Sequence, residues 1–193
     1  MQCWSSNGST TEPADMPTNL TAKQIASGYH TTCALKLDNT VVCWGTDKYG
    51  NYFGGANVPT NLTAKQISVG DFTTCVIKLD NTVQCWGDDR FGATKVPTNL
   101  TAKQIISGYT NACAIKLDDN TVQCWGSLSG GQKVPNGLTA KHISAGRANF
   151  CVIKLDNTVQ CWGFNDAPIN VVPASLMAKQ VDVGWHHAFV PLH

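Results

Sequence analysis

The stretch CVIKLDNTVQCWG (residues 75–87) decides the fold of this chain. Two runs of strand-forming residues flank an Asp-Asn turn, which is a strong signal for a β-hairpin. One cysteine lies on each arm, Cys75 and Cys85. Nearly the same sequence recurs as CALKLDNTVVCWG (33–45), CAIKLDDNTVQCWG (113–126) and CVIKLDNTVQCWG (151–163). A repeated, cysteine-bearing hairpin therefore dominates the sequence.

Around this hairpin the whole chain repeats with a period of about 38 residues. One marker glycine precedes each hairpin, with spacings of 42, 38, 38 and 38 residues. The marker glycines are Gly28, Gly70, Gly108, Gly146 and Gly184. Self-similarity at a fixed period is the signature of a repeat fold. We expect one domain of five units, at residues 16–57, 58–95, 96–133, 134–171, and 172–193 together with 1–15.

The two ends of the chain complement each other. The last unit stops before the second arm of its hairpin, and Gln2-Cys3-Trp4 matches the Gln-Cys-Trp of that arm. An open solenoid needs polar capping repeats, and none is visible. We therefore expect an all-β fold, a five-bladed β-propeller whose N-terminal strand completes the last blade and closes the ring. Each blade would have four antiparallel strands, the fourth preceding or including the Val-Pro step, where proline suits an edge.

The hairpin symmetry pairs the cysteines. With Asp80 at the centre of the turn, Cys75 lies opposite Cys85, close enough for a disulfide. The same register predicts the disulfides Cys33–Cys43, Cys75–Cys85, Cys113–Cys124 and Cys151–Cys161. Zinc is the competing interpretation, but the spacing differs from the short C-x-x-C of ribbon sites, so no metal is expected.

The ninth cysteine, Cys3, has no counterpart, because Phe189 occupies the matching position of the last unit. Cys3 is then either a buried free thiol or a link between two chains. We expect a monomer, with a dimer through Cys3 as the alternative.

Composition narrows the classes of partner. Charged residues make up 14% and the formal net charge is +1, which does not favour nucleic acid or an anionic membrane surface. No apolar run approaches the roughly 20 residues that a membrane helix needs, so no membrane insertion is expected. No signal peptide begins the sequence, yet the paired cysteines indicate an oxidising compartment. We expect a secreted protein whose leader is cleaved or omitted.

Blade geometry sorts the loops onto two faces. The loops between strands 1 and 2 and between strands 3 and 4 emerge at one face, which differs from unit to unit (the variable face). The other carries nearly identical Leu-Asp-Asn-Thr turns and Val-Pro linkers (the constant face). A constant scaffold that presents divergent loops rich in aromatic residues and arginine is typical of a recognition surface. The candidate binding residues are Tyr29, His30, Tyr49, Phe72, Arg90, Phe91, Tyr109, Arg147, Phe164, Trp185 and His186.

Two other repeated residue types leave alternatives open. The tryptophan beside each second hairpin cysteine could be a sugar platform, although its fixed strand position favours packing between blades. The lysine of each first strand could contribute to an axial ring that attracts an anion, or lie along the strand surface.

The residues also resemble a known family. A marker glycine, a Cys-Ala-Leu-type strand, an Asp-rich turn and a terminal Trp-Gly are similar to the repeat of the regulator of chromosome condensation family. The cysteine-paired form resembles its extracellular bacterial branch, which includes propeller-shaped secreted β-lactamase inhibitors. Those relatives mostly have seven blades and a histidine three residues after the glycine, found here only as His187. The resemblance implies a propeller and does not carry over an activity.

The sequence thus favours a secreted, non-enzymatic binding module whose ligand is a protein. The alternative is a lectin with one or more sugar pockets on the variable face, and no cofactor is expected. No motif of nucleophilic, metal or nucleotide chemistry is present. An enzyme would have to use the acids of the variable face, which are Asp47, Asp71, Asp88, Asp89 and Asp166.

Overall fold

The computed structural model describes residues 17–45, 56–129, 132–147, 149–163, 171–173, 175–184 and 187–190. Within these ranges the chain forms strands and turns and no helix, as expected of an all-β fold. A search of the same ranges for a helix long and apolar enough to cross a membrane finds none.

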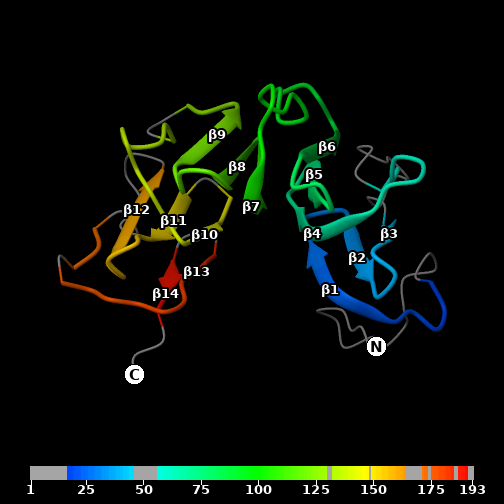
Figure 1. The fold of residues 1–193 in the computed structure, drawn as a ribbon, viewed down its shortest axis with the longest axis horizontal. Coiled ribbons are helices and arrows are strands. Elements are labelled where there is room, and N and C mark those ends of the chain that lie inside the picture. Colours follow the sequence, from blue (N-terminus) through cyan, green and yellow to red (C-terminus); the bar gives the residue numbers. More distant parts are fainter. Residues whose placement is uncertain are drawn as a thin grey trace.

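Each repeat folds into a small antiparallel sheet whose strands follow chain order (Figure 1). In the described ranges, four sheets have three strands and the fifth has two. The sheets are β1 (Ala22–Ser27), β2 (Thr32–Lys36) and β3 (Val41–Trp44); β4 (Ala64–Val69), β5 (Thr73–Lys78) and β6 (Val83–Gly87); β7 (Ala102–Ser107), β8 (Asn111–Lys116) and β9 (Val122–Gly126); β10 (His142–Ala145), β11 (Asn149–Ile153) and β12 (Val159–Gly163); and β13 (Asp182–Val183) and β14 (Ala188–Phe189).

We expected a fourth strand that precedes or includes each Val-Pro step, and the described sheets have at most three hydrogen-bonded strands. At 58–59, 96–97, 134–135 and 172–173 the chain is not in a strand. Proline has no N–H to donate to a ladder. The linkers instead make single bridges to the hairpin of the preceding repeat, as between Thr63 and Thr40 or Thr101 and Thr82.

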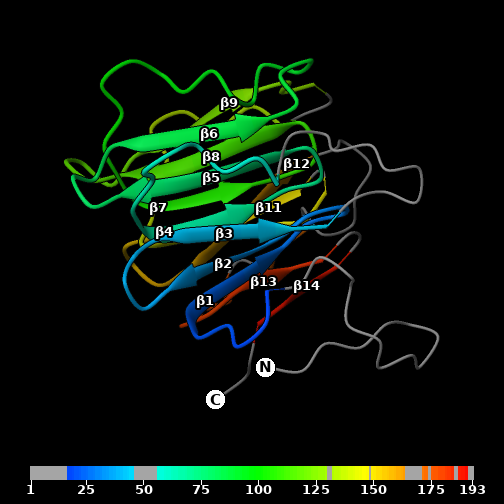
Figure 2. The ribbon, with the colours of Figure 1, turned by 90° about the vertical axis from the view of Figure 1, so that its right-hand side faces the viewer.

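The sheets succeed one another around an arc, with the first strands β1, β4, β7 and β10 in contact in turn. In Figure 1 the arc is open between β1 and β14, so the described sheets do not form the closed ring that we expected. The segment expected to close it, residues 1–15, lies outside the described residues. Figure 2 shows that the strands cross the thickness of the molecule, so that loops emerge at two opposite faces.

The four predicted disulfides are present. Each joins residues directly opposite in the ladder between the second and third strands, such as Cys75 and Cys85, with Cα atoms 4.0–4.1 Å apart. The hairpin turn beside each disulfide has its own polar bonds. Asp80 Oδ1 accepts hydrogen bonds from the Thr82 N–H at 3.0 Å and from its hydroxyl at 2.6 Å. Asn81 takes a positive φ of 71°, which asparagine tolerates better than most residues.

The hydrophobic core lies between consecutive sheets. At the first junction, Cys33 and Leu35 of β2 pack against Leu62, Ala64 and Ile67 of the next repeat. The other three junctions repeat this pattern. The described tryptophans of the repeat are buried, which agrees with a packing role. These residues are Trp44, Trp86, Trp125 and Trp162.

Polar clamps cross the same junctions. The Gln104 side chain accepts a hydrogen bond from the Ile143 N–H at 3.0 Å and donates one to the Ile143 carbonyl at 2.9 Å. Gln24 binds Ile67 in the same way, at 3.1 and 2.8 Å. The first three junctions thus combine apolar contact with a two-point amide clamp. At the fourth junction His142 replaces the glutamine, and its Nε2 lies 3.3 Å from the Val181 carbonyl oxygen.

The marker glycines lie where consecutive first strands come closest. A Cβ atom added to Gly70 would lie 2.1 Å from the carbonyl oxygen of Gly108, and one on Gly28 would lie 1.9 Å from that of Gly70. Only glycine permits this approach, which explains the regular spacing of these residues.

Candidate functional site

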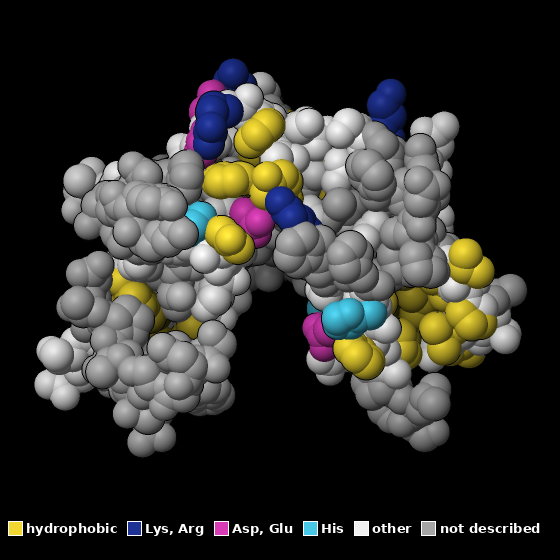
Figure 3. All heavy atoms as spheres, turned by 180° about the vertical axis from the view of Figure 1, so that it is seen from behind, with side chains coloured by type: hydrophobic (Ala, Val, Ile, Leu, Met, Phe, Trp, Pro, Cys, Tyr) yellow, Lys and Arg dark blue, Asp and Glu magenta, His cyan; other side chains and the backbone are white. Residues whose placement is uncertain are grey.

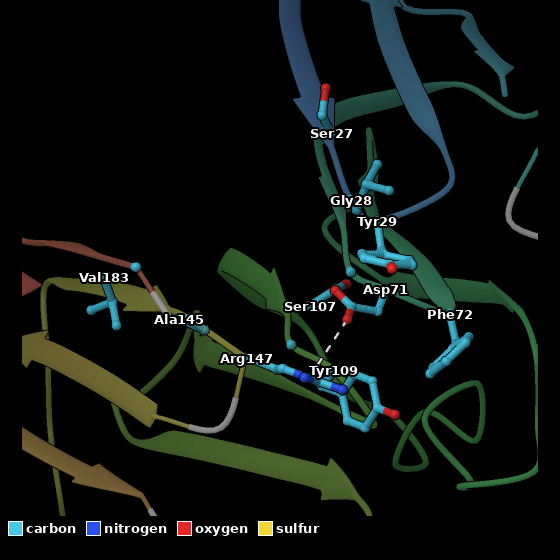
Figure 4. Close-up of a pocket in the computed structure, with 15 residues that line it drawn as sticks. Ser27, Gly28, Tyr29, Asp71, Phe72, Ser107, Tyr109, Ala145, Arg147 and Val183 are labelled. Atoms are coloured by element: carbon cyan, nitrogen blue, oxygen red, sulfur yellow. Dashed lines mark ion pairs between the residues drawn. The ribbon is translucent and has the colours of Figure 1, made fainter. Parts of the chain in front are cut away.

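A concave pocket of about 470 Å³ opens where the first strands end on the variable face. In the first four repeats the first strand runs into a marker glycine, and the next residue projects its side chain beside the pocket. Four such residues are Tyr29, Asp71, Tyr109 and Arg147. Figure 4 shows them pointing toward one another from separate repeats. The pocket is therefore built by the repeats together, with a different side chain from each.

An aromatic cluster adjoins the pocket. Phe72, Phe91 and Tyr109 come from three loops, and their ring centroids are 5.2–6.5 Å apart. Distances of this size are typical of interacting aromatic pairs. Phe91 is partly exposed, so the cluster presents apolar surface to the solvent.

Two arginines lie against this cluster. The Arg147 guanidinium carbon is 4.1 Å from the Tyr109 ring centroid, and that of Arg90 is 5.8 Å from Phe72 and 5.9 Å from Phe91. All three distances fall within the range of cation–π contacts. Figure 3 shows hydrophobic, basic and acidic side chains gathered beside one another on this side of the molecule.

Carboxylates hold the arginines in place. Asp88 Oδ2 accepts a hydrogen bond from Arg90 Nε at 2.7 Å and forms an ion pair with Nη2 at 2.5 Å. This bond is the main cause that lowers the pKa of Asp88 below its ordinary value. The Asp88 N–H donates to the Phe72 carbonyl at 2.9 Å, which ties the loop after β6 to the loop after β4.

Asp71 is in a different environment. It is partly buried at the pocket wall, and Arg147 Nε lies 4.0 Å from its Oδ2. Burial raises the pKa of Asp71, while the charges of Arg147 and His30 oppose the rise. Among the acids considered for catalysis, Asp88 and Asp89 have lowered pKa values because of Arg90 and Thr94, respectively. Such carboxylates do not suit a general acid, which needs a raised pKa.

Tyr29 and His30 form the edge of the surface on the side of the first repeat. Their rings meet edge to face at 4.3 Å, and Tyr29 is 71% exposed. A large aromatic side chain this exposed on a pocket rim is available for contact with a ligand.

The structure brings five of the predicted residues into one patch, Phe72, Arg90, Phe91, Tyr109 and Arg147 (the aromatic–arginine cluster). Tyr29 and His30 lie beside the same pocket. The other four, Tyr49, Phe164, Trp185 and His186, lie outside the described residues. The contacts by which Asp71 and Asp88 position the two arginines were not predicted from the sequence. Their positions in the sequence could have indicated these contacts, because Asp71 directly follows a marker glycine and Asp88 lies two residues before Arg90.

Four of the five repeated lysines have a hydrogen-bond partner, and three of them, Lys65, Lys103 and Lys141, line one open pocket. Within the described repeats, Lys23, Lys65, Lys103 and Lys141 each donate a hydrogen bond to the turn asparagine of their own hairpin. The described part of the chain also contains no group of three His, Cys, Asp or Glu side chains placed to hold a metal.

Comparison with known proteins agrees with this architecture. The family model described as "Regulator of chromosome condensation (RCC1) repeat" matches residues 22–51, 64–93 and 140–167. No curated protein matches the sequence.

Solved structures extend the similarity. The entire ectodomain of the Physcomitrella patens receptor kinase CR4 is similar, with a TM-score of 0.73 and 24% identity over 86% of this chain and 48% of that one. The CRINKLY WD40 ectodomain of the Arabidopsis thaliana receptor kinase ACR4 has a TM-score of 0.58 and 26% identity over 72% of this chain and 48% of that one.

A third similar structure is Prp20p from Saccharomyces cerevisiae, with a TM-score of 0.72 and 17% identity over 86% of this chain and 55% of that one. The chain spans about half the length of these relatives. Their fold and the repeated hairpin agree with the family match, and the chain contains regulator of chromosome condensation repeats at residues 22–51, 64–93 and 140–167.

Proposed function

We propose that this chain is an extracellular, non-enzymatic module that binds a protein partner through its variable face. The observation that carries the proposal is the aromatic–arginine cluster, in which three rings and two guanidinium groups from three repeats form one surface. Tyrosine, tryptophan and arginine dominate binding hot spots, because they contribute large rigid contact areas together with polar groups.

The unequal chemistry of the repeats favours a protein over a set of identical small ligands. The residue after the marker glycine is tyrosine, aspartate, tyrosine and arginine in the first four repeats. Equivalent ligand sites would need equivalent side chains at these positions. Unlike side chains at these positions are better suited to one protein partner whose surface is chemically varied.

The disulfides support an extracellular location. Four in one domain are expected in an oxidising compartment and are rare in the cytosol. Two of the similar structures are ectodomains of receptor kinases. Prp20p was described with binding properties to Gsp1p and histones, which is consistent with protein binding by this fold.

A lectin is the second candidate, and the pocket is the observation that favours it. Its volume is close to that of small-ligand sites, and Tyr29 and Asp71 could contribute stacking and hydrogen bonding to one sugar ring.

The test compares two double variants for capture of extracellular proteins. Phe72→Ala/Tyr109→Ala removes two rings of the cluster, and Leu79→Ala/Leu117→Ala removes two exposed side chains of the constant face. We expect the first to lower the affinity for the captured protein by more than about tenfold and the second to leave it unchanged. Equal capture by both would contradict the proposal. Binding to a glycan array that is lost with Tyr29→Ala would favour the lectin.

A further inference from the structure

Every junction between repeats buries the same positions of the repeat that follows. Ile67, Ile105, Ile143 and Val181 occupy equivalent places in the first strands, and each is at most 2% exposed. In the first repeat the equivalent residue is Ile25, which is 45% exposed. Leu20 and Ala22 also lie at positions whose counterparts Leu62 and Ala64 are buried. The first repeat thus presents an uncovered copy of an internal junction, the first-repeat face (Leu20, Ala22 and Ile25).

The other half of the junction is uncovered at the opposite end. The residue five positions after the marker glycine packs against the following repeat, and it is Cys33, Cys75, Cys113 or Cys151, each fully buried. In the fifth repeat this residue is Phe189, which is 67% exposed.

The amide clamp shows the same pattern. Gln180 is the fifth-repeat counterpart of Gln24 and Gln104, which bind the backbone of the next repeat. In the structure the Gln180 side chain donates instead to Asp182 of its own repeat at 2.7 Å. Gln180 and Phe189 together form the fifth-repeat face, which has both chemical parts of a junction.

The two faces lie at opposite ends of the open arc (Figure 1), where one copy as described does not bring them together. We propose that they bind each other between two copies of this chain, head to tail. Phe189 and Gln180 of one copy then dock against Ile25 of the second. The interface continues the pattern of the four internal junctions, with a phenylalanine in place of the disulfide. The Ile25 N–H donates to the Gln180 side-chain oxygen and the Ile25 carbonyl accepts from its amide nitrogen, as Ile143 does with Gln104. Because the two faces differ, the contact is heterologous.

The test uses the oxidised 193-residue chain in a Cys3→Ser background, so that no link through Cys3 contributes. Sedimentation velocity over a range of concentrations should show self-association. Ile25→Asp and Phe189→Asp should each weaken it by more than about tenfold, because each buries an unpaired carboxylate in the contact. Leu37→Asp, at an exposed turn position of the first repeat, is the matched control and should associate like the parent.

Mixing the two defective variants gives the sharpest outcome. Each retains one intact face, so Ile25→Asp and Phe189→Asp together should form a dimer with a single junction, although each alone is monomeric. Gln180→Ala gives a milder variant of the fifth-repeat face, and circular dichroism verifies that every variant is folded. A parent chain that stays monomeric at all concentrations, or a mixture that does not pair, would overturn the proposal. Protection of the Ile25 amide from hydrogen exchange in a monomer would also overturn it, since the two faces would then meet within one copy.

Discussion

Gln104 shows how one polar side chain can hold two repeats together. Its side-chain amide makes hydrogen bonds with both the N–H and the carbonyl of Ile143, a residue that is only 1% exposed. Unpaired backbone groups at such a buried place are costly, because folding removes them from water. The repeated glutamine is therefore a structural residue of the junction, as the marker glycines are.

We predict that Gln104→Ala lowers the free energy of unfolding by about 1–3 kcal/mol, since it leaves both groups of Ile143 without a protein partner. Urea denaturation monitored by tryptophan fluorescence measures this. Gln180→Ala, studied in dilute protein, is the control, because its described side-chain bond is the exposed one to Asp182. It should change stability by less than about 0.5 kcal/mol. Equal losses in both variants would refute a role of the clamp in the junction.

At the scale of the element, the hairpin combines a disulfide with a polar turn. The Cys75–Cys85 bridge closes a short loop across directly opposed residues, and the Asp80 carboxylate organises the turn beside it. Each hairpin therefore contains covalent and hydrogen-bonded constraints that act on the same few residues.

Removing one bridge tests the first constraint. We predict that Cys75→Ala/Cys85→Ala lowers the free energy of unfolding by about 2–3 kcal/mol, the range that loop-closure entropy gives for a loop this short. Guanidinium denaturation of the oxidised proteins gives the value. A loss below about 0.5 kcal/mol would mean that the junctions with neighbouring repeats already constrain this hairpin.

The turn carboxylates predict a loss of stability in acid. The hydrogen bond from the Thr40 hydroxyl, its largest cause, lowers the pKa of Asp38 from 3.8 to about 2. The pKa values of Asp80, Asp119 and Asp156 are lowered in the same way, by hydrogen bonds from their turn threonines. A carboxyl group whose pKa is lower in the folded than in the unfolded state stabilises the folded state at pH values above its unfolded pKa. This contribution is lost as the pH falls through the pKa of the folded state.

We therefore expect the urea midpoint to fall between about pH 4 and pH 2. Asp38→Ala should reduce the size of that fall, and Thr40→Val should act in the same direction because it deletes the main bond. Midpoints measured at half-unit intervals of pH provide the comparison. A fall of the same size in the parent and in Asp38→Ala would show that this turn does not contribute to it.

At the scale of the whole molecule, the periodicity of the sequence predicted the structure within each repeat but not the contacts between repeats. The disulfides followed from the register of a single hairpin, and five residues of the cluster, among them Phe72 and Tyr109, followed from where the repeats differ. The glutamine clamps and the contact of Asp71 with Arg147 cross between repeats, so no local pattern reveals them.

Two expectations about the assembly of blades differ from the structure for related reasons. Proline lacks a donor, so no strand forms at the described Val-Pro steps, the linkers make single bridges four residues after the proline, and the described sheets have three strands at most. The closed ring was inferred from Gln2-Cys3-Trp4 and a count of repeats, whereas the described sheets form an open arc. A repeat pattern specifies each junction, and it does not specify how many junctions complete a circle.

The central claim is that the variable face binds the partner while the constant face supports it. Hydrogen exchange of the chain, alone and in complex with the protein that it captures, tests this most directly. We predict slower exchange in the complex at residues 71–72, 90–92 and 109–110, with unchanged exchange in the hairpin turns at 79–82 and 117–121. Protection confined to those turns, with the aromatic–arginine cluster unaffected, would contradict the account.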